Sequence, residues 1–273
     1  MKKRASLWGW FWVLLGVVYF LVPLVGTFTF SLEMKRDVLS FASYQAVFAD
    51  PDFARTFLFS NQMALLTIIG SLALFVPTAY WVHLKVPHLR PVVEFITLMP
   101  FVIPAIVLVF GMIKLYKNPV TIGSLTLIQA PTNSVLGTNM LLVAGYVVLA
   151  MPYMYRAVDT GLRAMDVRNL TEAAQSLGAG WFTIIVRVIL PNLRSALLSG
   201  ALLTFAIVVG ELTLANFLDR PAFGPYLWLL GQHRAYEPAA LSIISFSLTW
   251  AAMGMIFLVS RGRGGQGQVA GAH

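Results

Sequence analysis

Residues 56–82 read TFLFSNQMALLTIIGSLALFVPTAYWV, a stretch of 27 residues that contains no Asp, Glu, Lys or Arg. An α-helix rises about 1.5 Å per residue, so about 20 residues cross the roughly 30 Å hydrocarbon core of a bilayer. The apolar residues form an uninterrupted block rather than the one-sided stripe of a soluble amphipathic helix. The stretch therefore predicts a transmembrane helix.

Five further segments are similarly apolar, and the charged residues within them are Lys114, Arg156 and Glu211. Across the chain 58% of the residues are hydrophobic and only 11% are charged, whereas soluble domains contain about 25% charged residues. The sequence therefore predicts an all-α integral membrane protein, organised as a single transmembrane domain over residues 1–273. Its six predicted spans are residues 7–30, 56–82, 95–116, 135–157, 195–218 and 238–260.

The basic start of the chain, Met1 to Arg4, resembles that of a secretory signal. The apolar segment after it is much longer than the 7–15 residues of a signal, and no small-x-small cleavage site follows. We therefore expect a retained first helix with the N-terminus in the cytoplasm. Six spans then return the C-terminus to the cytoplasm.

The positive charges support this orientation. Of the 19 Lys and Arg residues, twelve fall on the predicted inner side and seven on the outer side, as the positive-inside rule expects. Topology, rather than nucleic-acid binding, accounts for the net charge of +8. The inner set comprises Lys2, Lys3, Arg4, Lys85, Arg90, Arg156, Arg163, Arg168, Arg187, Arg194, Arg261 and Arg263.

The longest inner connection, residues 156–194, contains two predicted short helices. Asn169 followed by Glu172 has the spacing of a capping box and predicts the start of the first helix. The segment 178–180, Gly-Ala-Gly, breaks that helix, and Pro191 is expected to end a second helix that starts at Trp181. The simplest interpretation is two surface helices that link two spans.

The same loop resembles the EAA loop of binding-protein-dependent ABC importer permeases. That pattern is EAA, three residues, Gly, nine residues, Ile, one residue, Leu-Pro. The chain matches it over about residues 166–191 and between the fourth and fifth spans; it departs only at Val188, where the family has Ile. The matching residues are Glu172, Ala173, Ala174, Gly178, Leu190 and Pro191.

The resemblance implies a type I (MetI-like) ABC importer permease fold in the bacterial inner membrane, with this loop as the coupling helix that docks on a cytoplasmic ATPase dimer. It also implies a second permease subunit, in a homodimer or a heterodimer, and a periplasmic or extracellular solute-binding protein that contacts loops near residues 31–55, 117–134 and 219–237. The sequence contains no P-loop motif. The chain is thus expected to have no catalytic residues and no cofactor of its own, with ATP and Mg²⁺ bound by the ATPase.

Glu211 is the one acidic residue within a predicted span. An intramembrane carboxylate is costly and is by default a functional candidate. It can line the translocation pathway, together with Thr213 and Asn216 about one turn along, or it can form hydrogen bonds within the helix bundle. Asn61 and Gln62, near the outer end of the second span, are weaker pathway candidates. His83 and His88 are expected to be interfacial polar residues, and no metal-site motif is present.

The segment 98–104, Leu-Met-Pro-Phe-Val-Ile-Pro, and the order of the spans are most similar to spermidine/putrescine-type permeases. A polyamine is accordingly the expected solute, with ferric iron, sulfate or molybdate, and phosphonate as alternatives. An ion-coupled secondary transporter would also use an intramembrane Glu, but it would show repeated spans and has no use for an EAA loop. An intramembrane enzyme would need a catalytic group of residues that the spans lack.

Overall fold

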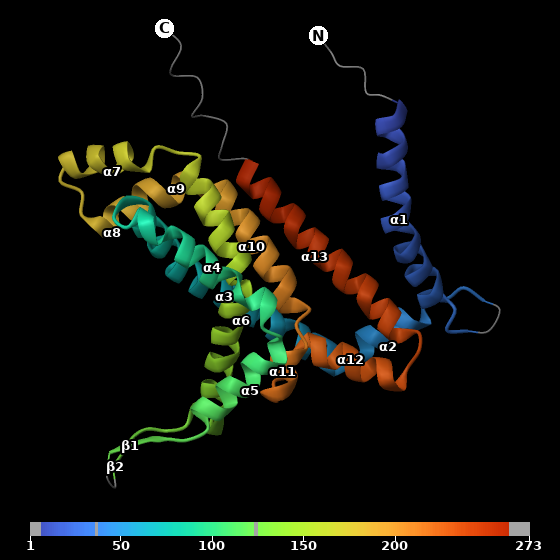
Figure 1. Cartoon of the computed structure of the whole chain (residues 1–273). Coiled ribbons are helices and arrows are strands. Elements are labelled where there is room, and N and C mark those ends of the chain that lie inside the picture. The colour runs from blue at the N-terminus through green and yellow to red at the C-terminus, as the bar shows by residue number, and fades with distance from the viewer. Residues whose placement is uncertain (1–6, 36–37, 123–124, 262–273) are drawn as a thin grey trace. The chain divides into compact units, whose positions relative to one another are not determined.

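The computed structural model describes residues 7–35, 38–122 and 125–261 (Figure 1). Several charges counted above lie outside these ranges: Lys2, Lys3, Arg4, Arg36 and Arg263. The chain divides into two compact units, each described by itself below. The first is Met1–Ala54 with Tyr226–Ala252, and the second is Arg55–Pro225 with Met253–His273.

The first unit contains α1 (Leu7–Leu32), α2 (Ala42–Ala49), the start of α3 (Pro51–Leu84), most of α12 (Phe223–His233) and much of α13 (Glu237–Arg261). Hydrogen bonds connect the short elements: the Ser31 and Tyr44 hydroxyls lie 2.8 Å apart, and the Tyr226 hydroxyl donates to Asp50 at 2.9 Å. Most of α1 is exposed, including Tyr19 and Phe20 at 72% and 75%. An apolar helix without cover in its own chain needs lipid or another subunit around it.

The second unit holds the rest of α3 and the elements that follow it as far as the start of α12 (Figure 1). These are η1 (Pro87–Leu89), α4 (Arg90–Val102), α5 (Ala105–Tyr116), β1 (Val120–Ile122), β2 (Leu125–Ile128), η2 (Pro131–Asn133), α6 (Val135–Arg163), α7 (Val167–Ser176), α8 (Trp181–Ile184), the π-helical η3 (Ile185–Ile189), α9 (Leu190–Asn192), α10 (Arg194–Val209) and α11 (Thr213–Phe217).

Its buried core joins α3, α6 and the segment from α7 to α9. Tyr80 of α3, Met154 and Leu162 of α6, and Ile184 and Ile189 of the following segment are all at most 3% exposed and belong to one apolar cluster. The loop between α6 and α10 is thereby packed firmly onto the ends of two long helices.

Three helices are long and apolar enough to cross a membrane: Trp8–Leu32, Pro51–Leu84 and Val135–Arg163. Two further pairs of consecutive helices are strongly bent at a short break, and they raise the number of spans to five if each pair is one span. Both numbers refer to the described residues and rest on helix length and composition. The sixth predicted span coincides with α13, which does not enter that number.

The third predicted span is not one straight helix. Pro87–Val102 and Ala105–Tyr116 meet at an angle of 101°. The bend follows from Pro104, whose ring disfavours helical backbone at the preceding residue; Ile103 is extended, with φ −88° and ψ 116°.

The expectation of an all-α chain also needs a small correction. Residues 120–128 of the predicted external loop form an antiparallel pair of strands, β1 and β2, with Thr121 opposite Thr126. β-Branched residues are frequent here, and their side chains suit an extended backbone.

Candidate functional site: the loop between α6 and α10

The first helix of the loop, α7, begins earlier than the capping-box pattern predicts. Asp166 is its N-cap residue, and the Asp166 carboxylate accepts a hydrogen bond from the Asn169 backbone NH at 3.1 Å. Asn169 is therefore not the cap but a residue of the first turn. The sequence allowed either choice, because both residue types cap helices well.

Gly178 ends α7 in a Schellman motif. The Gly178 NH donates to the Gln175 carbonyl at 2.9 Å, and the Ala179 NH donates to the Ala174 carbonyl at 3.0 Å. This motif places the residue after the C-cap in the left-handed region; Gly178 has φ +79°. A Cβ atom at Gly178 would meet nothing within 4 Å, so within this chain backbone conformation, rather than room, calls for glycine.

The outward side of the loop carries apolar and charged groups next to each other. Leu177 and Phe182 are 89% and 72% exposed, and Ala173 is exposed as well. The Glu172 carboxylate pairs with the Arg168 guanidinium at 2.9 Å. This hydrogen bond from Arg168 to Glu172 raises the pKa of Arg168 above its ordinary value. Large exposed apolar side chains on a polar loop are typical of an interaction surface.

The inward side of α7 is anchored to α3 and α6. Val167 and Thr171 are buried, and the Thr171 hydroxyl lies 3.0 Å from the Tyr80 hydroxyl at the end of α3. Thr171 and Glu172 are neighbours in sequence, but they face opposite sides. The inner side of α7 is thus held to α3 by a direct contact and to α6 through the shared apolar cluster.

Pro191 does not end the second helix as expected. Leu190 and Pro191, both half-buried, lie within a helical run that continues to Asn192 before it turns by 81° into α10. A proline ring normally collides with the carbonyl four residues earlier. The preceding π-helical turn, Ile185–Ile189, has a wider hydrogen-bond spacing that relieves this collision.

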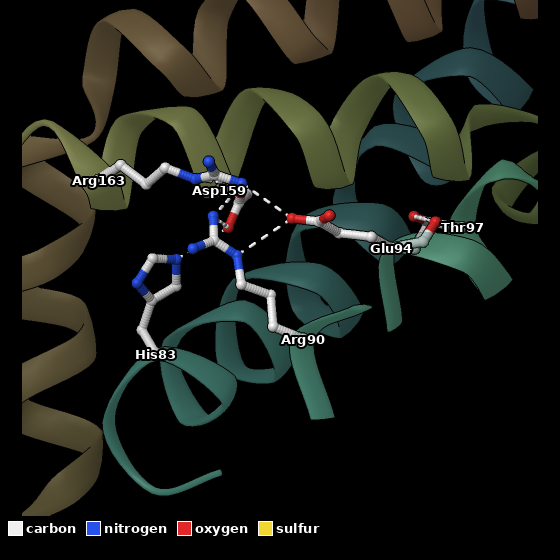
Figure 2. A network of polar contacts seen from close by, with 6 residues as sticks. All are labelled: His83, Arg90, Glu94, Thr97, Asp159 and Arg163. Carbon is white, nitrogen blue, oxygen red and sulfur yellow. Dashed lines mark hydrogen bonds and ion pairs between the residues drawn. The ribbon is translucent and has the colours of Figure 1, made fainter. Parts of the chain in front are cut away.

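A group of charged side chains that the sequence analysis did not single out lies at the base of this loop (Figure 2). Asp159 is 5% exposed and accepts hydrogen bonds from His83 at 2.8 Å, from Arg90 at 3.0 and 3.1 Å, and from Arg163 at 2.9 Å. Glu94 pairs with Arg90 at 3.1 Å and with Arg163 at 2.8 Å. His83 is therefore a partner of a buried carboxylate, not a simple interfacial residue.

One signal for this group was present in the sequence. Arg90 and Glu94, like Asp159 and Arg163, are opposite charges four residues apart, a spacing that places them on one face of a helix. The pairing between α4 and α6 joins residues 69 positions apart and could not be read from spacing.

Glu211 lies where the fifth predicted span breaks. Residues 195–218 are not one helix, because α10 ends at Val209 and α11 begins at Thr213. The Glu211 carboxylate accepts hydrogen bonds from the backbone NH groups of Thr213 at 2.6 Å, Leu214 at 3.0 Å and Ala215 at 3.3 Å. It thus caps the start of α11, where unpaired NH groups favour negative charge.

The other candidate pathway residues differ in how far their side chains are exposed. Thr213 is half-buried, whereas Asn216, one turn along α11, is exposed. The Asn61 side chain donates to the Phe57 carbonyl of its own helix at 2.7 Å, and Gln62 is exposed. Within the described ranges no group of three or more His, Asp or Glu residues could hold a metal ion.

Comparison with known families decides what kind of protein carries this loop. The profile described as "Binding-protein-dependent transport system inner membrane component" matches residues 68–262. The chain belongs to this family. The family resemblance that the EAA loop indicated is therefore confirmed. As a member of the family, the chain is a multi-pass inner membrane component of a binding-protein-dependent transport system.

Relatives within the binding-protein-dependent permeases are distant. Spermidine/putrescine transport system permease protein PotB of Escherichia coli (strain K12) is 28% identical over 167 residues, 59% of each chain, so the alignment spans well under two thirds of that protein. A probable molybdenum ABC transporter permease protein of Haloferax volcanii is 32% identical over 148 residues, 54% of this chain and 52% of the relative.

A solved structure shows the same fold. A chain of a bacterial ABC transporter involved in the import of the acidic polysaccharide alginate has a TM-score of 0.69 and 15% sequence identity. The match covers 93% of this chain and 95% of the other.

Proposed function

We propose that this chain forms half of the translocation pathway of an ATP-driven solute importer and that the loop between α6 and α10 couples it to the ATPase. In this proposal α7, with Glu172, Ala173, Ala174 and Gly178, is the coupling helix. Leu190 and Pro191 shape the return of the chain into the membrane.

The observation that carries the proposal is the two-sided construction of α7. Its inner side, with Val167 and Thr171, is buried against α3 and α6, while Leu177 and Glu172 on its outer side are exposed. A coupling element needs both properties: a surface that a partner can grip, and a firm connection to the helices that must move. In this proposal the partner is the separate ATPase that the resemblance to ABC importer permeases implies.

The proposed subunit crosses the membrane six times, with both termini in the cytoplasm. A second permease chain completes the pathway; Tyr19 and Phe20 of α1, which are 72% and 75% exposed, lie on an apolar surface that such a chain or lipid can cover. A solute-binding protein delivers the solute at the outer face, near residues 31–55, 117–134 and 219–237.

We propose a polyamine as the solute to test first, on the basis of the spermidine/putrescine permeases among the relatives. The molybdenum permease among them makes an oxyanion the second candidate. Uptake of labelled spermidine or molybdate into vesicles that contain the complete transporter, each in competition with the other unlabelled solute, separates the two. Molybdate uptake that spermidine does not reduce would reject the polyamine.

The coupling proposal is tested by purifying the chain from detergent-solubilised membranes and identifying co-purifying subunits by mass spectrometry. We expect a P-loop ATPase and a second permease to co-purify, and Gly178→Asp to release the ATPase while the protein stays inserted. Aspartate tolerates the left-handed backbone better than most residues, so loss of the ATPase would report the contact surface rather than a misfolded loop.

Gly180→Asp is the matched control. Gly180 is the N-cap residue of α8, has φ −75°, and has open space around a Cβ atom. Asp is a favourable residue at an N-cap. We expect this variant to retain the ATPase. A wild-type chain that purifies as a stable unit without any ATPase would overturn the coupling proposal.

A further inference from the structure

The charged residues at the base of the loop form a closed ring across two helices. On α4, Arg90 precedes Glu94 by one turn; on α6, Asp159 precedes Arg163 by one turn. Each acid contacts both arginines: Asp159 at 3.0 and 2.7 Å, and Glu94 at 3.1 and 2.8 Å. Four charges thus alternate in sign around the ring, and His83 of α3 contacts the buried acid (Figure 2).

Burial differs between the two sides of the ring. The side chain of Asp159 is 6% exposed, whereas those of Glu94 and Arg163 are 42% and 52% exposed. A buried carboxylate is stable only when its partners satisfy it, so the inner half of the ring holds one arrangement firmly. The outer half is in contact with solvent and contributes less, because water screens it.

The ring connects α4 to α6 through charged side chains, whereas the loop helices are connected to α3 and α6 mainly through apolar ones. The loop helices are held to α3 and α6 by an apolar core, to which α4 contributes Val93 at its edge. At its cytoplasmic start, α4 is held to α6 by the ion pairs of Arg90 and Glu94. From there α4 leads, across the 101° bend, into α5.

We propose that Asp159 and Arg90 are positioning residues for coupling, and that the ring carries movement of the α6–α7 unit to α4. This inference rests on the proposed role of α7 as the coupling helix. The ion pairs lose their geometry when one helix slides by a fraction of a turn along the other. They therefore favour movement of α4 together with α6. Asp159 lies one turn before the end of α6, directly before the loop that the ATPase would move.

The test uses the complete transporter in proteoliposomes and measures solute imported per ATP hydrolysed. Asp159→Asn keeps the shape of the side chain but removes the charge. We expect uptake to fall about tenfold, within the 5–150-fold that allosteric coupling free energies span, while ATP hydrolysis and co-purification of the ATPase remain near the wild-type values. Asp159→Glu keeps the charge, so we expect it to lower the amount of solute imported per ATP hydrolysed less than Asp159→Asn does.

Two further variants keep the test decisive if Asp159→Asn fails to accumulate. Glu94→Gln and Arg163→Gln alter the half-exposed side of the ring, which folding tolerates more easily, and both are expected to lower the same ratio by a smaller factor. Thr97→Val is the matched control: Thr97 lies on α4 one turn after the outer acid, and its hydroxyl donates to the Glu94 carbonyl of its own helix rather than to the ring.

The possible outcomes separate this inference from the proposed function. If uptake and hydrolysis fall in proportion, or if the ratio is unchanged in all ring variants, the ring is only structural and the inference is overturned. If the wild-type chain binds no ATPase, the proposed function itself fails. A fall in the ratio that is specific to the ring, with the ATPase still bound, supports the assignment.

Discussion

The hydroxyl oxygens of Tyr80 and Thr171 lie 3.0 Å apart, and both side chains are buried. The two residues are 91 positions apart, one in the last turns of α3 and the other on the inner side of α7. This contact fixes the rotation of α7 about its axis, and thereby decides which residues of the loop face outward.

Tyr80→Phe tests that contact. Because the Thr171 hydroxyl also bonds the Val167 carbonyl at 2.7 Å, it keeps one partner, and we expect the loss of a single hydrogen bond, about 1 kcal/mol of stability. Thermal unfolding of the purified protein in detergent should show a fall of about 3 °C. Thr78→Val is the control, because that hydroxyl bonds only a carbonyl of its own helix. Equal shifts in both variants would contradict a specific role for the Tyr80 contact.

The left-handed conformation at Gly178 predicts an order among substitutions there. A Cβ atom has room at this position but is strained at φ +79°. The cost for ordinary residues is about 1–2 kcal/mol, and it is lower for Asn. We therefore expect Gly178→Asn to keep the Schellman turn and Gly178→Val to disrupt it. Protease sensitivity of the loop in inverted membrane vesicles measures this; a Val variant as resistant as wild type would show that the turn does not need glycine.

Glu211 is expected to act first as a helix cap. Glu211→Ala leaves three backbone NH groups of α11 without their acceptor and should cost about 0.5–2 kcal/mol, the range for loss of a cap. Glu211→Gln keeps an acceptor oxygen and should cost less. The uptake assay separates capping from attraction of a cation: a cap predicts greater loss in Ala than in Gln, whereas equal and complete loss of polyamine uptake in both variants would favour a direct role of the charge.

Gly224 is required for close packing against the same break. A Cβ atom at Gly224 would collide with the Glu211 carbonyl oxygen, a backbone atom that cannot move aside on its own. Gly224→Ala should therefore destabilise the protein by about 1–3 kcal/mol, the usual cost of overpacking. Gly231→Ala, on the same helix but in open space, should be neutral or stabilising, since Ala favours a helix. The comparison is again made by thermal unfolding, and an equal effect of the two changes would refute the packing argument.

Local signals in the sequence predict some features of this chain and miss others. The apolar block 56–82 lies within α3, and the segment Glu172 to Gly178 led to the correct family. In contrast, Asp166 rather than Asn169 caps α7, and Pro191 lies inside a helical run. In the first case both residue types cap helices well, and in the second the π-helical turn Ile185–Ile189 relieves the collision that a proline ring would otherwise cause.

By itself the sequence determined that this protein is a membrane-embedded helical chain and that it belongs to the family of binding-protein-dependent transport components, because charge-free length and a spaced motif are properties of consecutive residues. Only the tertiary structure decided that Thr171 of α7 meets Tyr80 of α3, and that Asp159 and Arg163 of α6 form a ring of ion pairs with Arg90 and Glu94 of α4. The reason is physical: an ion pair or a hydrogen bond between helices forms only when atoms from distant segments meet, whereas the bend at Pro104 and the Glu211 cap involve residues at most four positions apart. Spacing along one helix says which side chains share a face, but not which helix that face will meet.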